Sequence, residues 1–285
     1  MEIRKGENKM EQNKNKKILK KSILGIICAI VVIAISFVIY EIATRHNTYY
    51  IGEKNLQIPI FVYHNLVEDE SQIEYDYMES TVDTFEKQIT GLMKLGYVPI
   101  SYEDLVKYKN GEIAIPKWSC LITFDDGYEN VYKYAFEIAK KYNIPITSFA
   151  IDDQVGYDSC YTWEQAKEMH DSGLVSIYSH GLSHIKYNEI STEQLVSDIE
   201  TAHKHLCEEL EDENLLKVFT YPYGLYTGED LGALEKAGFI QNLTDNKINR
   251  SKNLNLSALH RCYPLNDSLF KILIKIQYRS LKYRD

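Results

Sequence analysis

Cysteine is scarce in this 285-residue chain, and its five cysteines include no C-x-x-C pair. Zinc-finger and thioredoxin-like sites need such closely spaced thiols, so both classes are excluded. Cys28 lies in an apolar run near the N-terminus, and the other four are scattered. Cys120 falls inside a segment expected to form an apolar strand, which is typical of a buried free thiol. We therefore expect no disulfide framework.

Charge is absent from residues 22–40, SILGIICAIVVIAISFVIY, and is mostly positive just before them. Residues 1–21 contain eight lysines and arginines against three glutamates, a net charge of +5. An uncharged helix of 19 residues would be roughly 28 Å long, enough for the hydrocarbon core of a bilayer. The basic flank predicts that the N-terminus stays in the cytoplasm and that the rest of the chain lies outside the cell.

The chain is thus expected to have four parts: a basic cytoplasmic tail (1–21), a transmembrane anchor (22–40), a polar stalk (41–57) and one folded domain (58–285). A cleaved signal peptide is the alternative, but its apolar region usually has about 7–15 residues and ends in small residues. We expect a single-pass protein of the cell membrane with an extracellular domain. Because the whole chain is −9 and residues 1–21 are +5, the remainder is −14, which argues against nucleic acid as a partner.

No internal repeat is visible in the remainder, where apolar strands alternate with amphipathic helices. Strands are predicted at 58–64, 97–101, 119–124, 145–151, 174–179, 217–221 and 239–243. Helices are predicted at 82–95, 102–111, 129–142, 162–172, 192–212 and 227–237, with a terminal amphipathic helix or strand from 266. This alternation is typical of parallel βαβ units, and about seven of them predict a single α/β domain, a closed or nearly closed (β/α) barrel.

Two adjacent carboxylates, Asp125 and Asp126, follow the apolar run SCLITF and precede a glycine. In a (β/α) barrel the chemistry lies at the C-terminal ends of the strands, where this pair is placed. His180 and His184 follow another apolar strand, without the glutamate of the zincin motif H-E-x-x-H. Residues four apart are ~13 Å apart on a strand but ~6 Å apart on a helical turn, so the strand must end near His180 if both bind one ion.

Two imidazoles and one carboxylate would form an open three-ligand metal site, at which the pKa of a water molecule falls and a carbonyl group is polarised. The second carboxylate would then be available as a general base. Each motif also has a simpler interpretation, because Asp-Gly is a common turn signal and paired histidines can lie on a surface, as expected for His203 and His205. Their joint occurrence at successive strand ends favours the metal site.

The segments TFDDGY (123–128) and SHGLSH (179–184) resemble the first two motifs of the polysaccharide deacetylases, the NodB-homology or carbohydrate esterase 4 family. The resemblance covers roughly residues 57–265. It implies that Asp125 is the catalytic base and that a divalent ion, in the first instance zinc, is held by Asp126, His180 and His184.

The third family motif usually reads Arg-x-Pro-Tyr, whereas residues 220–224 read TYPYG. By resemblance, the backbone N–H of Tyr223 helps to hold the oxyanion. Thr220 stands where the arginine is expected, so the sequence predicts that Asp125 lacks its usual partner.

The segment PIFVYHNL (59–66) resembles the start of a subgroup that deacetylates poly-N-acetylglucosamine. In that subgroup the barrel is circularly permuted, the acid histidine comes from this early strand, and YPYG tends to occur without arginine. His64 is therefore our first choice for the general acid. The alternative is His260, because family members normally have a late Leu-His and ALHRCY supplies one.

The favoured function is metal-dependent hydrolysis of N-acetyl groups from N-acetylglucosamine units of a cell-surface polysaccharide, either poly-N-acetylglucosamine or peptidoglycan. Two alternatives stay open. A catalytically silent, membrane-tethered glycan-binding protein is favoured by the missing arginine, and a metal-dependent amidase or phosphoesterase would act on a small molecule.

Overall fold

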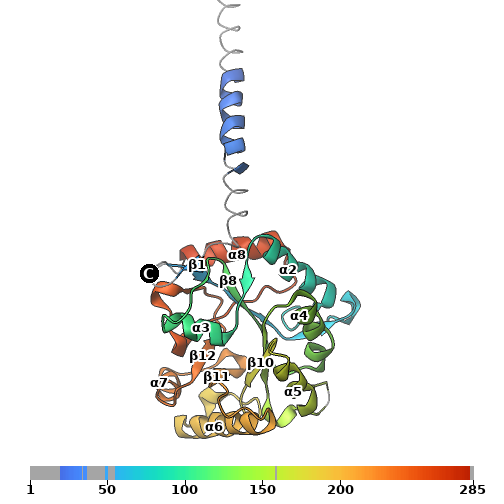
Figure 1. Cartoon of the computed structure of the whole chain (residues 1–285), viewed down its shortest axis with the longest axis vertical. Coiled ribbons are helices and arrows are strands. Elements are labelled where there is room, and N and C mark those ends of the chain that lie inside the picture. Colours follow the sequence, from blue (N-terminus) through green and yellow to red (C-terminus); the bar gives the residue numbers. More distant parts are fainter. Residues whose placement is uncertain (1–19, 34, 37–48, 51–54, 158, 283–285) are drawn as a thin grey trace, which may run out of the picture. The chain divides into compact units, whose positions relative to one another are not determined.

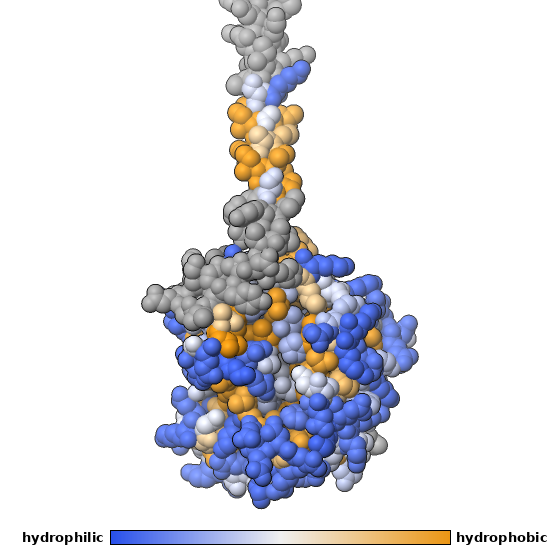
Figure 2. Space-filling view, viewed as in Figure 1, coloured by the Kyte–Doolittle hydropathy of each residue, from blue (hydrophilic) through white to orange (hydrophobic). Residues whose placement is uncertain are grey.

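The computed structural model describes residues 20–33, 35–36, 49–50, 55–157 and 159–282. The chain divides into two compact units, Met1–Arg45 and His46–Asp285. In the first unit, residues 20–33 and 35–36 are helical, and mostly apolar side chains cover this helix (Figure 2). No helix among the described residues is both long enough and apolar enough to cross a membrane. Residues 34 and 37–40 of the predicted anchor, and residues 1–19 of the predicted tail, lie outside the described residues.

The second unit contains a barrel of parallel strands (Figure 1). Around the barrel the order is β3 (Ile60–Tyr63), β8 (Ser119–Phe124), β9 (Ile146–Ala150), β10 (Val175–Ser179), β11 (Val218–Thr220), β12 (Ile240–Leu243) and β14 (Leu259–His260). A short strand, β6 (Val98–Pro99), pairs with the start of β8. The prediction of an α/β barrel of about seven units is confirmed.

The barrel closes between its first and last strands. A parallel bridge joins Phe61 of β3 to Cys262, two residues after the end of β14. The N–H of Val62 donates to the carbonyl of Cys262 at 3.1 Å, and the N–H of Cys262 donates to the carbonyl of Ile60 at 2.9 Å. Segments about 200 residues apart in the sequence therefore lie side by side.

The main strands follow from continuous apolar sequences. Every residue of β8 (SCLITF) and β9 (ITSFA) is buried, as expected for strands with the barrel interior on one side and helices on the other. The helices are α2 (Val82–Lys94), α3 (Tyr102–Lys109), α4 (Phe136–Tyr142), α5 (Trp163–Asp171), α6 (Thr192–Glu209), α7 (Gly228–Lys236) and α8 (Leu269–Lys282). Five of them begin after a serine or threonine whose side chain accepts a hydrogen bond from the third helical N–H, namely Thr81, Ser101, Thr162, Ser191 and Thr227.

Several elements differ from the predictions. The helix predicted at 129–142 begins as a π-helix, η3 (Val131–Ala135), and the one predicted at 192–212 ends at Glu209. The tail from 266 is the helix α8. Three pairs of short strands were not predicted, because two or three residues carry no periodic pattern: β1 (Tyr49–Tyr50) with β7 (Ile115–Pro116), β2 (Gln57–Ile58) with β13 (Asn249–Arg250), and β4 (Asn65–Val67) with β5 (Glu79–Thr81). The predicted stalk, 41–57, is therefore partly paired with the domain.

Two clusters of buried apolar side chains form the core of the second unit. The larger one fills the barrel and the space beneath α2 to α5, and Leu56 is its first residue. The smaller one lies where α6 and α7 cover β11 and β12. Both clusters and every strand of the barrel belong to residues 46–285, so this unit contains the core that it needs to fold without residues 1–45.

Candidate active site

Asp125 and Asp126 lie directly after β8, at the C-terminal end of the barrel. The chain reverses there in a left-handed conformation, with φ of 73° at Asp126 and 75° at Gly127. A side chain at residue 127 would also contact the ring of Tyr161 at 3.4 Å, so glycine is favoured by both conformation and space. A non-glycine residue such as Asp126 rarely adopts this conformation, and such strain is concentrated at functional sites.

The two histidines lie in the loop after β10. Because β10 ends at Ser179, His180 and His184 are on a bent segment rather than on an extended strand. Gly181, between them, has a φ of 88°, and a Cβ atom there would overlap the hydroxyl of Tyr187. His184 is itself left-handed, with a φ of 52°. The tight turn brings both imidazoles to the end of β8.

The three predicted ligands converge. Oδ1 of Asp126 lies 3.3 Å from Nε2 of His180 and 3.5 Å from Nε2 of His184, and all three ligand atoms lie within 4.8 Å of one another. Nδ1 of His180 donates to the backbone carbonyl of Thr220 at 2.9 Å, which leaves Nε2 without a proton when the ring is neutral. Such a carbonyl partner orients metal-binding histidines in general. Thr220 therefore contributes to the site through its backbone.

The charges at this cluster suit a cation. Burial opposes ionisation of Asp126, yet the hydrogen bond and charge of His180 lower the pKa of this carboxyl group. Burial also opposes a charge on His180, but Asp126 and Asp125 together raise the pKa of the imidazole. Among the described residues, the ion pairs of Asp126 involve only these two histidines. Two imidazoles, one carboxylate and a shortage of positive charge fit a divalent metal ion.

Asp125 has a partner that the sequence did not reveal. Nη1 and Nη2 of Arg261 donate to Oδ1 and Oδ2 of Asp125 at 2.7 and 2.8 Å, in a bidentate pair. The guanidinium group also donates to Thr244 at 2.8 Å and lies over the ring of Phe149. The prediction that Asp125 lacks an arginine was wrong, because the guanidinium comes from the residue directly after the last strand of the barrel instead of residue 220.

This pair determines the charge of Asp125. The carboxylate is only 3% exposed, and burial alone would raise its pKa. The charge and hydrogen bonds of Arg261 outweigh burial and lower the pKa of Asp125 to about 2. Asp125 is therefore ionised at neutral pH and held in one orientation, as a general base must be.

The two candidate acids lie in different places. Nε2 of His64, just after β3, is 4.0 Å from Oδ2 of Asp125, and its ring stacks on Tyr263. Burial lowers the pKa of His64. His260 instead donates from Nδ1 to Asp245 at 2.9 Å. Neighbouring residues of an extended segment point to opposite faces, so His260 points away from the site that Arg261 enters. The geometry favours His64.

Tyr223 completes the set of predicted site residues. Its backbone is left-handed, with a φ of 59°, and its ring lies 4.6 Å from the ring of His184. The ring is largely exposed. The structure thus places the YPYG turn beside the predicted metal ligands, while the role of the Tyr223 N–H toward an oxyanion stays a prediction.

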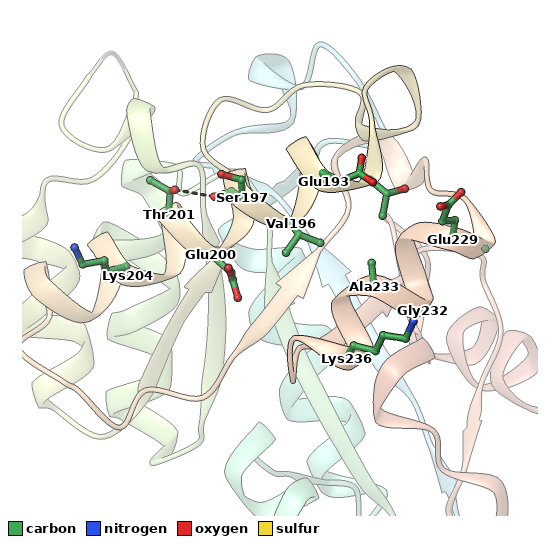
Figure 3. A pocket seen from close by; sticks show the side chains of 12 residues that line it. Glu193, Val196, Ser197, Glu200, Thr201, Lys204, Glu229, Gly232, Ala233 and Lys236 are labelled. Carbon is green, nitrogen blue, oxygen red and sulfur yellow. Dashed lines mark hydrogen bonds between the residues drawn. The ribbon is translucent and has the colours of Figure 1, made fainter.

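The groove of about 890 Å³ between α6 and α7 is distinct from this site (Figure 3). Acidic and basic side chains alternate along it with small residues, and none of the predicted site residues lines it.

Comparisons with known proteins agree with this geometry. Residues 114–241 match a family model described as polysaccharide deacetylase. The chain is 29% identical over 209 residues to a Bacillus subtilis (strain 168) protein, YxkH, named as a polysaccharide deacetylase, a match that covers 73% of this chain and 72% of the relative. It is 28% identical over 204 residues to the poly-beta-1,6-N-acetyl-D-glucosamine N-deacetylase of Staphylococcus aureus (strain N315), covering 67% and 69%.

Solved structures share the fold. IcaB from Ammonifex degensii superposes with a TM-score of 0.67 and 26% identity, over 81% of this chain and all of that one. A deacetylase from Streptococcus pyogenes, solved in complex with acetate, superposes with a TM-score of 0.70 and 23% identity, over 78% of this chain and 99% of that one.

Proposed function

The chain belongs to the polysaccharide deacetylase family, and from this premise we propose that it hydrolyses N-acetyl groups of N-acetylglucosamine units in a metal-dependent reaction. The proposed substrate is a cell-surface polysaccharide, with poly-N-acetylglucosamine preferred over peptidoglycan. The relatives named above and the early histidine, His64, support this preference. The observation that carries the proposal is a cluster of three ligands next to an arginine-bound carboxylate at one end of the barrel.

Asp126, His180 and His184 would hold the divalent ion, for which zinc is the first candidate because of its preference for such nitrogen and oxygen ligands. When bound, the ion supplies Lewis acidity, which polarises the acetyl carbonyl and lowers the pKa of water. Thr220 keeps His180 in the required orientation through its backbone carbonyl. Asp126, His180 and His184 would therefore bind the ion, and Thr220 would keep one of these ligands in position.

Asp125 takes the proton from the attacking water, and Arg261 keeps the carboxylate ionised and directed toward it. The backbone N–H of Tyr223 donates to the oxygen that becomes negative as the carbonyl carbon turns tetrahedral. His64, in its protonated form, gives its proton to the amide nitrogen as the C–N bond breaks. Acetate and a free glucosamine amine leave.

Arg261 weakens the case for a catalytically silent glycan-binding protein. That alternative depended on the arginine missing from residue 220, and the guanidinium is present on Asp125 in another position of the sequence. A small-molecule amidase would be recognised by activity on a panel of short acetamides together with inactivity on polymers.

The test is acetate release by the purified full-length protein. Poly-N-acetylglucosamine oligomers, peptidoglycan and a simple acetamide are each incubated with the metal-loaded protein, with protein treated with a chelator, and with treated protein to which zinc is restored. We expect release from the oligomers that chelation removes and zinc restores. Release that survives complete removal of metal would contradict metal dependence, and release from peptidoglycan alone would contradict the proposed substrate.

We further propose that the N-terminal segment anchors the barrel outside the cell. The basic residues before the uncharged run 22–40 support this orientation. Protease added to intact cells should then remove residues 46–285, whereas full protection of this unit would contradict the proposal.

A further inference from the structure

The outer face of α8 carries large apolar side chains in solvent. Phe270, Ile274 and Tyr278 are 71%, 50% and 60% exposed, and their spacing of four residues aligns them along one side of the helix. The opposite side holds Ile272 and Ile276, which are buried against the barrel, and α8 packs beside α2 (Figure 1). The exposed stripe therefore contributes nothing to the core.

Positive charge accompanies this stripe. The helix contains Lys271, Lys275 and Lys282 and no acidic residue, although Asp267 just before it pairs with the first two lysines. A fourth cation, Arg279, instead contacts the buried thiol of Cys262. This excess is unusual in a chain whose residues after the predicted anchor carry a net charge of −14. An apolar stripe flanked by lysines is the pattern of helices that lie in the surface of a membrane.

A basic pocket adjoins the C-terminal end of α8. It has a volume of about 520 Å³ and is lined by Lys282 together with Lys247, Arg250 and Lys252, by several asparagine side chains and by His260. Two of these residues, Lys247 and His260, form ion pairs with Asp245. Amide and cationic donors around one hollow suit the phosphate of a lipid head group.

The chain passes this same pocket six residues after its first described pairing with the domain, at Tyr49. Asn55 lines it, and the N–H of Leu56 donates to Ser251 at 2.8 Å. Tyr49 is the first described residue paired with the domain, nine positions after the predicted anchor ends at residue 40. At roughly 3.5 Å per extended residue, this link would keep the domain within about 30 Å of the bilayer. A surface next to this link therefore meets lipid more often than any partner in solution.

From these observations we propose that the outer face of α8 and the adjoining basic pocket form a docking surface for a membrane that contains anionic phospholipids. Phe270, Ile274 and Tyr278 enter the boundary between head groups and acyl chains, while the lysines of α8 and the pocket contact phosphate groups. Since the domain is acidic overall, this surface is what allows it to lie on a negatively charged membrane without repulsion.

The test uses residues 46–285, which contain the complete core, so that the N-terminal segment cannot contribute. Flotation is measured with vesicles of phosphatidylcholine alone and with vesicles that also contain phosphatidylglycerol, at low and high salt. We expect binding to the anionic vesicles only. Joint replacement Phe270→Ser, Ile274→Ser and Tyr278→Ser should lower partitioning on the order of tenfold. Lys252→Gln and Lys282→Gln should each lower it about fivefold at low salt and reduce its salt dependence.

Tyr157→Ser is the matched control, because Tyr157 is 73% exposed but lies in the loop before α5 and not on α8. Its partitioning should equal that of the unchanged domain. Hydroxyl-radical labelling of Tyr278 in the unchanged domain, slowed by anionic vesicles, checks the contact without any substitution. The proposal is overturned if the triple variant binds normally, if Tyr157→Ser has the same effect, or if Tyr278 is labelled equally with and without vesicles. It is also overturned if the stripe holds a dimer in solution that the triple variant dissociates.

Discussion

Two neighbouring carboxylates after β8 differ in their partners, and the partners separate their roles. Asp125 binds a permanent cation, Arg261, through both oxygens, whereas Asp126 faces two imidazoles that are neutral when they bind a metal. Asp125 therefore keeps its charge without a metal, whereas Asp126 would have its charge compensated by a bound metal ion. Adjacent residues can serve as base and ligand because the left-handed turn at Asp126 points their side chains in different directions.

Replacing each carboxylate with its amide should separate these roles. Asp125→Asn should keep its metal but lose turnover by about 10²–10⁴-fold, because an amide cannot take a proton from water. Asp126→Asn should lose metal, and excess metal should restore part of its activity. Metal content and acetate release, measured on the same preparations, check both expectations. Near-normal turnover of metal-loaded Asp125→Asn would contradict the role of Asp125 as base.

Replacing Arg261 should change the pH profile. Arg261→Met removes the main group that opposes the effect of burial, so the pKa of Asp125 rises and the acidic limb of kcat/KM moves to higher pH. The free energy of unfolding should fall by about 3–5 kcal/mol at neutral pH, because a buried carboxylate loses its partner. In the unchanged protein, the depressed pKa stabilises the fold above pH ~4, and this contribution is lost as the pH falls toward 2.

Arg261→Lys keeps the charge without the bidentate geometry and serves as the conservative control. Its acidic limb should lie between those of the unchanged protein and Arg261→Met. If the acidic limb of kcat/KM lies at the same pH in all three proteins, the group whose ionisation it reports is not Asp125.

The choice between the two histidines can be tested in the same way. His64→Gln should flatten the alkaline limb of kcat/KM, because this limb reports the acid that protonates the leaving amine. His260→Gln should change it less, since His260 is paired with Asp245. Burial lowers the pKa of His64 from its ordinary value, so this limb extends into acidic pH, and acetate release is measured from acidic to alkaline pH for both variants. The reverse order of effects would assign the acid to His260.

Sequence reasoning found the residues that follow strand ends and missed the one that depends on closure of the barrel. Asp125, Asp126 and His180 come directly after apolar strands and His184 lies four residues beyond His180, so their position could be derived from local pattern. Arg261 is 136 residues away from Asp125, and only the pairing of the last segment with β3 brings it there. The position of Arg261 directly after His260 was a usable signal. Successive side chains of an extended segment point to opposite faces, so if His260 points away from the barrel, Arg261 points into it.

At the scale of elements, α6 supports the loop that holds the two histidines. Its Asp198 accepts hydrogen bonds from the N–H of Leu182, at 3.3 Å, and from the hydroxyl of Tyr187. The N–H groups of Asp152 and Asp153 donate to the carbonyls of Gly181 and Leu182 at 3.1 and 3.0 Å. The turn that orients His180 and His184 is therefore held from both sides by groups outside the predicted ligand set.

Loosening this support should weaken metal binding. Tyr187→Phe and Asp198→Ala each remove a bond to the loop, and losses in outer partners of metal sites typically cost about 10–100-fold in affinity. Zinc affinity is measured by competition with a chelating dye. Glu200→Gln, on the same helix but exposed, is the control and should bind as the unchanged protein does. Equal affinities in all four proteins would show that the ligands hold their positions without α6.

Element boundaries were predictable where burial imposes a long pattern. The strand predicted at 119–124 agrees with β8 residue for residue, because all six side chains are buried. The π-helix η3 could not be predicted, since its residues have the same apolar spacing as an α-helix. The two-residue strands β1 and β2 depend on partners distant in sequence, so the predicted stalk extended too far into the domain.

At the scale of the whole molecule, residues 1–45 should contribute little to the stability of the barrel. Every core cluster of the second unit lies after residue 45. Deletion of these residues should leave the melting temperature of the domain unchanged within about 2 °C, in a fold where 1 kcal/mol corresponds to roughly 2–4 °C. Scanning calorimetry of both proteins in the same detergent checks this, and a decrease of more than about 5 °C would contradict it.

The seam between β3 and Cys262 also determines when, during synthesis, the enzyme becomes complete. A ribosome delivers β3 and Asp125 early and Arg261 136 residues after Asp125, so a growing chain has the three predicted ligand side chains before it has the guanidinium. Until that last segment arrives, one edge of β3 has unpaired N–H and C=O groups, which invite pairing with other chains. Translation that stops before Arg261 therefore yields an open, aggregation-prone sheet in which Asp125 lacks its guanidinium partner.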